Sequence, residues 1–255
     1  MEMLLSRGPI RRPYARRALR WLGGIALAIA LAVAALAFAA GFFDRDPIHF
    51  FGDFGPGRTR VAALYFSGDM GLRFGMGPHV TQALAARHIP VMGVSSPTIF
   101  ARHRNRAEVD AVIAGAVRDA LAHAHADRLV LIGQSFGSDV LGTGVADLPA
   151  DLRGRIAAIV LVVPGQTVFF RADPTSLTYR GTPDGQAIDT MRTVSWAPVI
   201  CIYGQRETDS LCPLLGAGVR RIALPGGHFL ANDSARLIAT ILASLRRILP
   251  GEIPA

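Results

Sequence analysis

The sequence predicts a single α/β domain with a mainly parallel sheet flanked by helices. Short apolar runs alternate with longer stretches in which apolar residues recur at helical spacing. This alternation is typical of βαβ units, whose strands are buried on both faces and therefore read as continuous apolar runs. A third observation is the pentapeptide GQSFG at residues 133–137, which separates an apolar run from a helix-compatible stretch.

The expected strands are the apolar runs that turn residues or helical stretches bound on either side. In chain order they are residues 48–51, 61–66, 89–94, 129–132, 156–163, 199–203 and 219–224. Helices are expected in a stretch that follows residues 61–66 and ends near residue 87, over residues 107–124, after Ser138, and over residues 235–248. Residues 164–194 are rich in Thr, Asp, Pro and Gly, which predicts an irregular excursion from the sheet.

The N-terminal region has the pattern of a membrane anchor. Residues 21–43 form an apolar run with no charged residue, and at 1.5 Å per residue this run spans the ~30 Å hydrocarbon core. Six arginines precede the run, which predicts a cytoplasmic N-terminus and an exported domain. A cleaved signal peptide is the alternative, but the run exceeds the usual apolar region of such peptides.

The resulting organisation is a basic cytoplasmic segment, a single-pass anchor in a bacterial inner membrane, a linker and a periplasmic domain. These parts are expected at residues 1–20, 21–43, 44–59 and 60–255, respectively. The formal net charge of +8 arises largely from the first of them. Because the dense basic cluster adjoins an apolar span rather than a groove-entering element, we expect no nucleic-acid partner.

The pentapeptide predicts a nucleophile elbow, which is a sharp strand-to-helix turn that presents a serine above a parallel sheet. Ser135 is then the candidate nucleophile. Gly133 and Gly137 fit this interpretation, because a tight turn brings backbone so close that a Cβ atom would collide with it.

A serine hydroxyl becomes nucleophilic when a histidine accepts its proton and a carboxylate orients that histidine. In α/β-hydrolases these partners follow the serine in the order acid, then histidine. His228 lies just after the last expected strand and is the candidate base. Asp209, in the loop after residues 199–203, is the preferred acid, and Glu207 in the same loop is the reserve.

The oxyanion formed during ester cleavage requires two backbone N–H donors. One is expected from Phe136, the residue after the nucleophile, and the other from Asp69 or Met70 in the loop after residues 61–66. A carboxylate near an oxyanion is unfavourable. The Asp69 side chain is therefore expected to point away and to cap the following helix.

The sequence has two cysteines, Cys201 and Cys212. They bracket the loop that carries Glu207 and Asp209, which we call the acid loop. In an oxidising compartment they can close a disulfide worth roughly 3 kcal/mol of loop entropy, and two buried thiols are the alternative. Two cysteines without a histidine at ligand spacing do not predict a metal site, and no motif predicts a cofactor.

Several motifs together resemble the VirJ/AcvB family of bacterial virulence proteins, which are α/β-hydrolases. The shared segments are SGD at 67–69, GQSFGSDVL at 133–141, CIYG at 201–204 with Asp209-Ser210 and Cys212-Pro213, and LPGGH at 224–228. The resemblance covers roughly residues 60–249. It implies Ser135 as nucleophile, Asp209 as acid, His228 as base and a bond between the two cysteines.

The resemblance also implies a periplasmic location and, through the AcvB-type branch, hydrolysis of aminoacylated phosphatidylglycerol. The chain departs from the family where the acyl pocket is expected. The usual GDGGW of the oxyanion loop is GDMGL at 68–72, and the aromatic stretch after the next strand is replaced by SSPTIF at 95–100. The resemblance therefore supports the family's mechanism for this chain more strongly than it supports the family's substrate.

The expected function is that of a membrane-anchored periplasmic serine esterase acting through an acyl-enzyme, with a membrane lipid as substrate. Two alternatives remain open at this stage. One is a non-catalytic interaction or secretion-accessory module built on a hydrolase fold. The other is a carboxylesterase or thioesterase acting on a soluble substrate, which the anchor disfavours.

Overall fold

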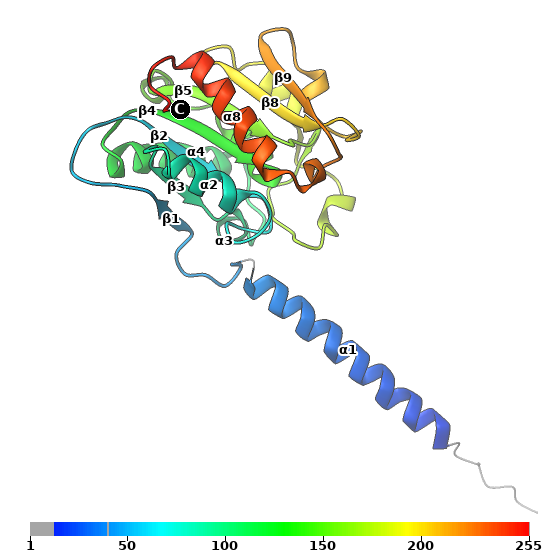
Figure 1. Cartoon of the computed structure of the whole chain (residues 1–255). Coiled ribbons are helices and arrows are strands. Elements are labelled where there is room, and N and C mark those ends of the chain that lie inside the picture. Colours follow the sequence, from blue (N-terminus) through cyan, green and yellow to red (C-terminus); the bar gives the residue numbers. More distant parts are fainter. Residues whose placement is uncertain (1–12, 40, 255) are drawn as a thin grey trace, which may run out of the picture.

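The computed structural model describes residues 13–39 and 41–254, and Figure 1 shows their arrangement. The expected cytoplasmic segment at residues 1–20 therefore lies partly outside the described residues. Helix α1 (Pro13–Ala39) projects from the domain, and its Leu, Ile and Val side chains are exposed from Leu19 onward. An 18-residue window within Arg17–Ala39 has a mean hydropathy of 2.5, and this stretch is long enough to cross a membrane. A signal sequence shares these properties.

A seven-stranded sheet forms the centre of the domain, in the order β1-β3-β2-β4-β5-β8-β9. Its strands are β1 (Ile48–Phe51), β2 (Thr59–Phe66), β3 (Val91–Val94), β4 (Ala126–Gln134), β5 (Ile156–Val162), β8 (Val199–Gly204) and β9 (Val219–Leu224). Only the pairing of β1 with β3 is antiparallel, and every other neighbouring pair of this sheet is parallel. The predicted α/β fold with a mainly parallel sheet is confirmed.

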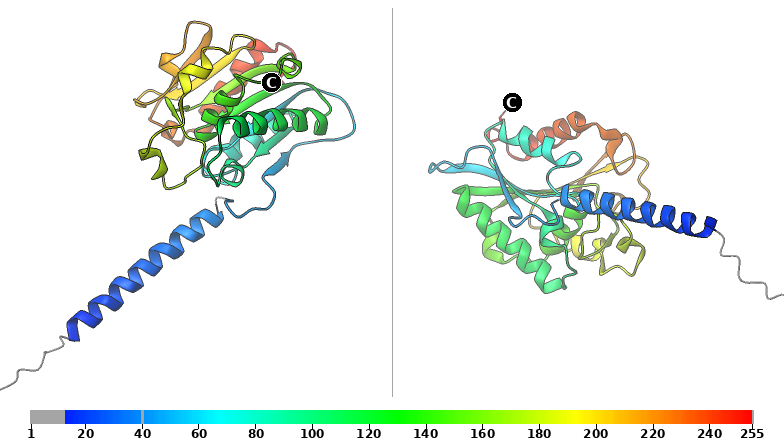
Figure 2. Two further views of the ribbon diagram at one scale, coloured as in Figure 1. Left: turned by 180° about the vertical axis from the view of Figure 1, so that it is seen from behind. Right: turned by 90° about the horizontal axis from the view of Figure 1, so that it is seen from below.

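Helices cover both faces of this sheet (Figure 2). One layer contains α2 (Gly77–Ala85) and α8 (Ser234–Ile248), and the opposite layer contains α4 (Arg106–His123) and α5 (Phe136–Gly144). Three shorter helices, α3 (Ser96–Ile99), α6 (Ala150–Arg153) and α7 (Ala187–Met191), and the 3₁₀ turns η1 (Thr178–Arg180), η2 (Cys212–Leu214) and η3 (Leu230–Asn232) lie in the connections.

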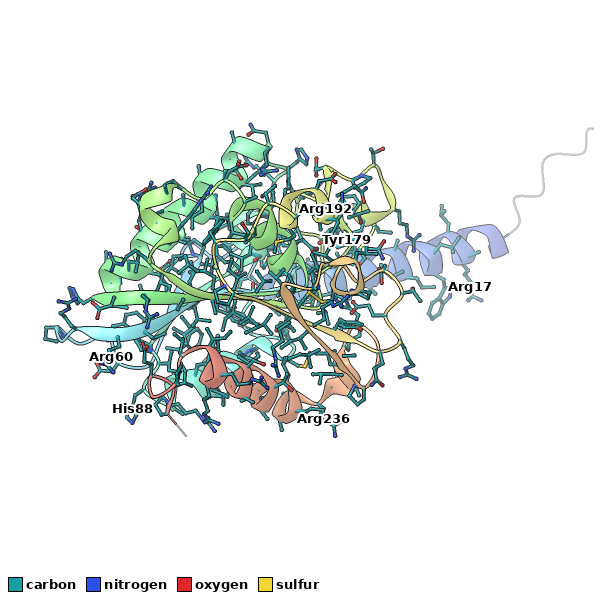
Figure 3. All side chains as sticks on the ribbon, turned by 90° about the horizontal axis from the view of Figure 1, so that it is seen from above. Arg17, Arg60, His88, Tyr179, Arg192 and Arg236 are labelled. Atoms are coloured by element: carbon teal, nitrogen blue, oxygen red, sulfur yellow. A yellow bond between two sulfur atoms is a disulfide. The ribbon has the colours of Figure 1, made fainter. Side chains whose placement is uncertain are left out.

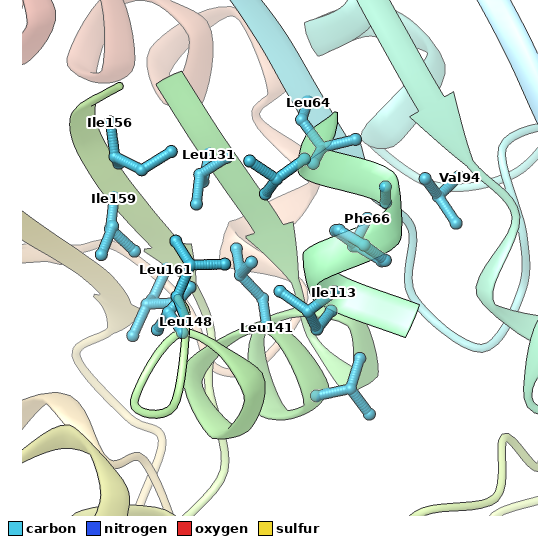
Figure 4. Packing of buried hydrophobic residues seen from close by; sticks show 14 of the residues in the cluster. Leu64, Phe66, Val94, Ile113, Leu131, Leu141, Leu148, Ile156, Ile159 and Leu161 are labelled. Carbon is cyan, nitrogen blue, oxygen red and sulfur yellow. The ribbon is translucent and has the colours of Figure 1, made fainter. Parts of the chain in front are cut away.

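Alternation along the strands divides the core into two clusters. Leu64 and Leu131 face the α4–α5 layer, whereas the adjacent Tyr65 and Ile132 face the α2–α8 layer. Figure 4 shows the first cluster, in which Ile113 of α4 and Leu141 of α5 pack near the strand residues. Because both faces are buried, β2, β4 and β5 are apolar without interruption over most of their length.

The segment between α1 and β2 is more ordered than a linker. Strand β1 lies within residues 44–59 and pairs with β3 along its whole length. Phe42 packs against the core cluster that contains α4 and α5. The folded domain therefore begins before residue 60, almost directly after α1.

The excursion at residues 164–194 is also ordered. It contains a two-stranded pair, β6 (Thr167–Val168) with β7 (Gly185–Gln186), as well as η1 and α7. The Asp173 carboxylate organises its turn by accepting hydrogen bonds from the backbone N–H of Thr175 at 2.9 Å and of Thr178 at 2.8 Å. Such local side-chain bonds replace the sheet ladder in a segment of this composition.

Candidate active site

Ser135 occupies the turn between β4 and α5, and its backbone angles are φ 52° and ψ −125°. A positive φ is costly for a residue with a side chain and persists only where the surroundings enforce it. Here the Ser135 N–H donates to the carbonyl of Val162 at 2.8 Å, which holds the turn against β5. The predicted nucleophile elbow therefore has the expected geometry.

The two glycines of the elbow are sterically required. A Cβ atom added at Gly133 would lie 2.6 Å from the carbonyl oxygen of Gly137, and one added at Gly137 would overlap the backbone of Phe66 and Ser67. Ser138 completes the attachment, because its hydroxyl donates to the carbonyl of Val162 at 2.9 Å. The start of α5 is thereby fixed against both β2 and β5.

His228 lies in the loop between β9 and α8, where the sequence predicts the base. Its Nε2 is 2.8 Å from the Ser135 hydroxyl oxygen. Its Nδ1 is 2.5 Å from a carboxylate oxygen of Glu207. Given these partners, Nδ1–H donates to Glu207 and Nε2 is left to accept the serine proton.

The structure differs from the prediction in which carboxylate contacts His228. Glu207, the reserve candidate, contacts His228, whereas the preferred Asp209 does not. The turn that follows β8 explains the difference, because the N–H of Glu207 donates to the carbonyl of Gly204 at 2.9 Å and directs its side chain inward. The side chain of Glu207 is only 3% exposed. Asp209 is exposed, and its backbone carbonyl accepts a hydrogen bond from Gln166.

The protonation of His228 follows from two opposing effects. Burial lowers the pKa of His228. The hydrogen bond and negative charge of Glu207 raise it, and the net effect leaves the pKa above its ordinary value. Smaller contributions from the charges of Asp139 and Asp209 act in the same direction. This arrangement can stabilise an imidazolium at His228.

The oxyanion donors are predicted on two segments that meet at Ser135. Phe136 is the first residue of α5. Gly68 lies close to the nucleophile, because a Cβ atom added to it would be 3.5 Å from the Cβ of Ser135. Asp69 and Met70 follow Gly68 and line the same cavity as Ser135. Their roles as donors stay predictions.

The expected orientation of the Asp69 side chain is wrong. Helix α2 begins only at Gly77, with Met76 at its N-cap, and Asp69 lies too far upstream to cap it. Its carboxylate instead accepts a hydrogen bond from the hydroxyl of Tyr179 at 3.1 Å. Burial raises the pKa of Asp69, although the bond from Tyr179 opposes this effect.

Two pocket residues were not predicted from the sequence. Tyr179, which Figure 3 labels, belongs to the excursion and stacks on Phe136 with ring centroids 6.5 Å apart. Asp139 follows Ser135 by one helical turn, a spacing that could have indicated its position on the same face of α5. Its carboxylate accepts a hydrogen bond from the N–H of Gly165 at 2.8 Å, and burial raises its pKa to about 8.

A cavity of about 690 Å³ opens at Ser135. Its lining includes Ser135 and His228 together with four carboxylates, those of Asp69, Asp139, Glu207 and Asp209. No arginine of the described chain lines it, and the full sequence contains no lysine. The cavity is therefore rich in carboxyl groups, and no arginine or lysine lies among its described lining residues to pair with those that are ionised.

Cys201 and Cys212 are bonded to each other, so the disulfide alternative is confirmed. Cys201 lies in β8 and Cys212 in η2, and the bond closes the loop that carries Glu207. Within residues 13–39 and 41–254, no group of three or more His, Cys, Asp or Glu side chains is placed to hold a metal ion.

The family model of the bacterial virulence protein VirJ matches residues 60–249. The chain belongs to the VirJ family. The match covers the elbow, the acid loop and the loop of His228. No curated protein matches the sequence.

Solved structures that are similar to the chain have α/β-hydrolase folds. Est1E from Butyrivibrio proteoclasticus has a TM-score of 0.57 at 12% identity, with coverage of 79% of this chain and 93% of Est1E. MenH from S. aureus has a TM-score of 0.53 at 10% identity, with coverage of 79% and 98%. The esterase domain of a Rhodothermus marinus protein has a TM-score of 0.51 at 14% identity, with coverage of 78% and 90%. At these identities the similarity establishes the fold.

Proposed function

We propose that this VirJ-family chain is a membrane-anchored, extracytoplasmic serine hydrolase that cleaves an ester through an acyl-enzyme on Ser135. The observation that carries the proposal is the continuous relay from Ser135 through His228 to Glu207, with distances of 2.8 Å and 2.5 Å, at a cavity large enough for an acyl group. Nucleophile, base and orienting acid stand in the order that acyl transfer requires.

In the acylation step, the Ser135 oxygen attacks the ester carbonyl while its proton passes to His228 Nε2. Negative charge develops on the carbonyl oxygen, where the N–H groups of Phe136 and of the Asp69–Met70 loop are proposed to donate. Collapse of the tetrahedral intermediate breaks the ester C–O bond, and His228 Nε2 returns the proton to the departing alcohol. The product of this step is the acyl-Ser135 ester.

In the deacylation step, water replaces the alcohol. His228 Nε2 accepts a proton from the water as its oxygen attacks the acyl carbon, and the same proton then restores the Ser135 hydroxyl. Glu207 remains ionised throughout and stabilises the transient imidazolium. Asp209 takes no part in these transfers.

The proposed substrate is an aminoacylated phosphatidylglycerol, as implied by resemblance to the AcvB-type branch. The carboxyl groups that line the cavity support an acyl group that carries an ammonium. Asp69 and Asp139 both have pKa values raised by burial. A cation bound beside them would favour their ionised forms and be held by charge-assisted hydrogen bonds. The disulfide and the apolar helix α1 fit a domain outside the cytoplasm and near a lipid.

The test uses the full chain in lipid vesicles that contain aminoacyl-phosphatidylglycerol or its N-acetylated form. We expect release of the amino acid and of phosphatidylglycerol, and no release with Ser135→Ala. Acetylation removes the ammonium and should slow release about tenfold to a hundredfold, because a charged hydrogen bond contributes roughly 1.5–3 kcal/mol.

Each contrary result has a distinct meaning. Equal rates on the two lipids would show that the carboxyl groups of the cavity do not select the ammonium. No turnover of either lipid, with Ser135 still reactive toward a fluorophosphonate, would overturn the substrate and leave the hydrolase. Turnover by Ser135→Ala would overturn the mechanism itself.

A further inference from the structure

Three exposed apolar side chains lie at the cavity or next to a residue that lines it, and they come from three separate loops. Phe74 follows β2, Leu177 belongs to the excursion and Phe229 follows β9, and they are 40%, 61% and 72% exposed. Phe74 and Phe229 line the cavity, and Leu177 adjoins Ser176, which also lines it. We call these three side chains the apolar rim. Single exposed apolar residues are ordinary, but their convergence around one opening indicates a binding surface.

The end of α1 is attached to the edge of the sheet that holds the active site. The carbonyl of Gly41, two residues after α1, accepts a hydrogen bond from the Thr98 hydroxyl at 2.7 Å. The carbonyl of Pro47 accepts one from the N–H of Ser95, also at 2.7 Å. Ser95 and Thr98 follow β3, and the carboxyl ends of the parallel strands carry the active-site loops.

An ion pair connects the same region to the loop after β2. Asp44 is the first charged residue after the apolar run and is expected near the bilayer surface. Its carboxylate binds the Arg73 guanidinium at 2.9 Å. Phe74, the next residue, belongs to the apolar rim. Phe74 of the apolar rim is therefore adjacent in sequence to Arg73, which is ion-paired with the segment just after the anchor.

The arrangement of the whole molecule agrees with this placement. In Figures 1 and 2, α1 leaves the domain on the side where the 164–194 excursion and the loop before α8 lie. In Figure 3, Tyr179 of the pocket wall lies on the side of the domain from which α1 extends. The cavity and the anchor therefore occupy the same end of the domain.

We propose that the apolar rim of Phe74, Leu177 and Phe229 inserts into the interfacial layer of the bilayer that α1 spans, so that the cavity opens onto lipid. Arg180, three residues after Leu177, is exposed and suits a lipid phosphate. A lipid then reaches Ser135 from the membrane without crossing water. The inference rests on the proposed anchorage and not on the identity of the ester.

The test measures membrane depth on the full chain in lipid bilayers. Phe74→Cys, Leu177→Cys and Phe229→Cys each introduce one free thiol for a fluorescent label, since both native cysteines are bonded. Phe43→Cys at the end of the anchor is the positive control. Phe50→Cys is the matched negative control, because Phe50 is 47% exposed on edge strand β1.

Lipids that carry a nitroxide near the headgroup should quench the three rim labels and the label at 43 at least threefold more than the label at 50. Rim labels that remain as accessible to water as the label at 50, while the label at 43 is quenched, would overturn the proposal. Absence of quenching at 43 would overturn it as well, because the anchorage would then be missing. No readout depends on hydrolysis, so failure here is distinguishable from failure of the proposed activity.

Discussion

The nucleophile elbow and the acid loop lie on opposite sides of His228, and they differ in how strongly local sequence determines them. At the elbow, backbone contacts exclude a Cβ atom at residues 133 and 137, so few sequences can form the turn. In the acid loop, two carboxylates stand two residues apart, and both line the cavity. One turn hydrogen bond, from the N–H of Glu207 to Gly204, decides which of them meets the histidine. Close-packed backbone therefore restricts the sequence of the elbow more than turn hydrogen bonds restrict that of the acid loop.

The largest effect on activity is expected at the elbow, from Ser135→Ala. This change removes the nucleophile and its acyl-enzyme while the strand and helix around it remain. Ester hydrolysis should fall about 10⁵-fold or more, since loss of the serine in comparable triads costs on the order of 10⁶. A steady-state assay with a chromogenic ester measures the loss, and circular dichroism serves as the folding control. Activity within tenfold of the unchanged chain would contradict the assignment.

The steric side of the comparison is tested by Gly137→Ala. The added Cβ would overlap the backbone of Phe66 and Ser67, which cannot move without disturbing β2. We expect destabilisation beyond about 4 kcal/mol, which is exceptional for a single substitution. Gly115→Ala in α4 is the control, because its Cβ would meet nothing within 4 Å. That change should stabilise by up to about 1 kcal/mol. Urea denaturation compares them, and equal stabilities would show that the elbow is not sterically restricted.

The acid loop is tested by the pair Glu207→Gln and Asp209→Asn. Glu207→Gln removes the carboxylate that orients His228, and kcat should fall about 10³- to 10⁴-fold. Asp209→Asn should change kcat by less than about threefold, because its carboxylate makes no contact with the histidine. A larger loss from Asp209→Asn than from Glu207→Gln would restore the acid that the sequence favours.

The same pair predicts a shift in pH dependence. His228 must be neutral to accept the serine proton, so kcat/KM falls as the pH drops through its pKa. Glu207 raises that pKa, and its replacement should therefore move the acidic limb of the profile to lower pH. Asp209→Asn should move the limb in the same direction by less, since its charge contributes less than that of Glu207. A shift to higher pH in Glu207→Gln would contradict the proposed ion pair.

The smallest effect on activity is expected from removal of the disulfide that links the acid loop to the sheet. Replacement of Cys201 and Cys212 by Ser opens the loop and should cost roughly 2–4 kcal/mol of stability. Below the melting temperature, activity should fall much less than in Glu207→Gln, because the turn at Gly204 persists. Thermal melts of the unchanged chain with and without reductant give an independent measurement. Coincident melts would show that the bond does not stabilise the loop.

The sequence was sufficient to predict what periodicity and steric restriction determine. The seven strands of the main sheet, the positions of Ser135 and His228 and the expected bond between the cysteines all correspond to features of the structure. The carboxylate that contacts His228 was predicted wrongly as Asp209, because the sequence does not show how the turn after β8 directs the side chain of Glu207. Tyr179 and its contact with Asp69 also escaped prediction, because 110 residues separate them and no periodic pattern connects them.

The most direct test of the relay is labelling with a fluorophosphonate, which reacts with a serine only when a base activates it. On the full chain, we predict one covalent adduct on the tryptic peptide that spans residues 129–153, with fragmentation placing it on Ser135 rather than on Ser138. Labelling should be abolished in Ser135→Ala and strongly slowed in Glu207→Gln but not in Asp209→Asn. An unlabelled chain, or an adduct on another serine, would contradict the assignment of Ser135 as an activated nucleophile.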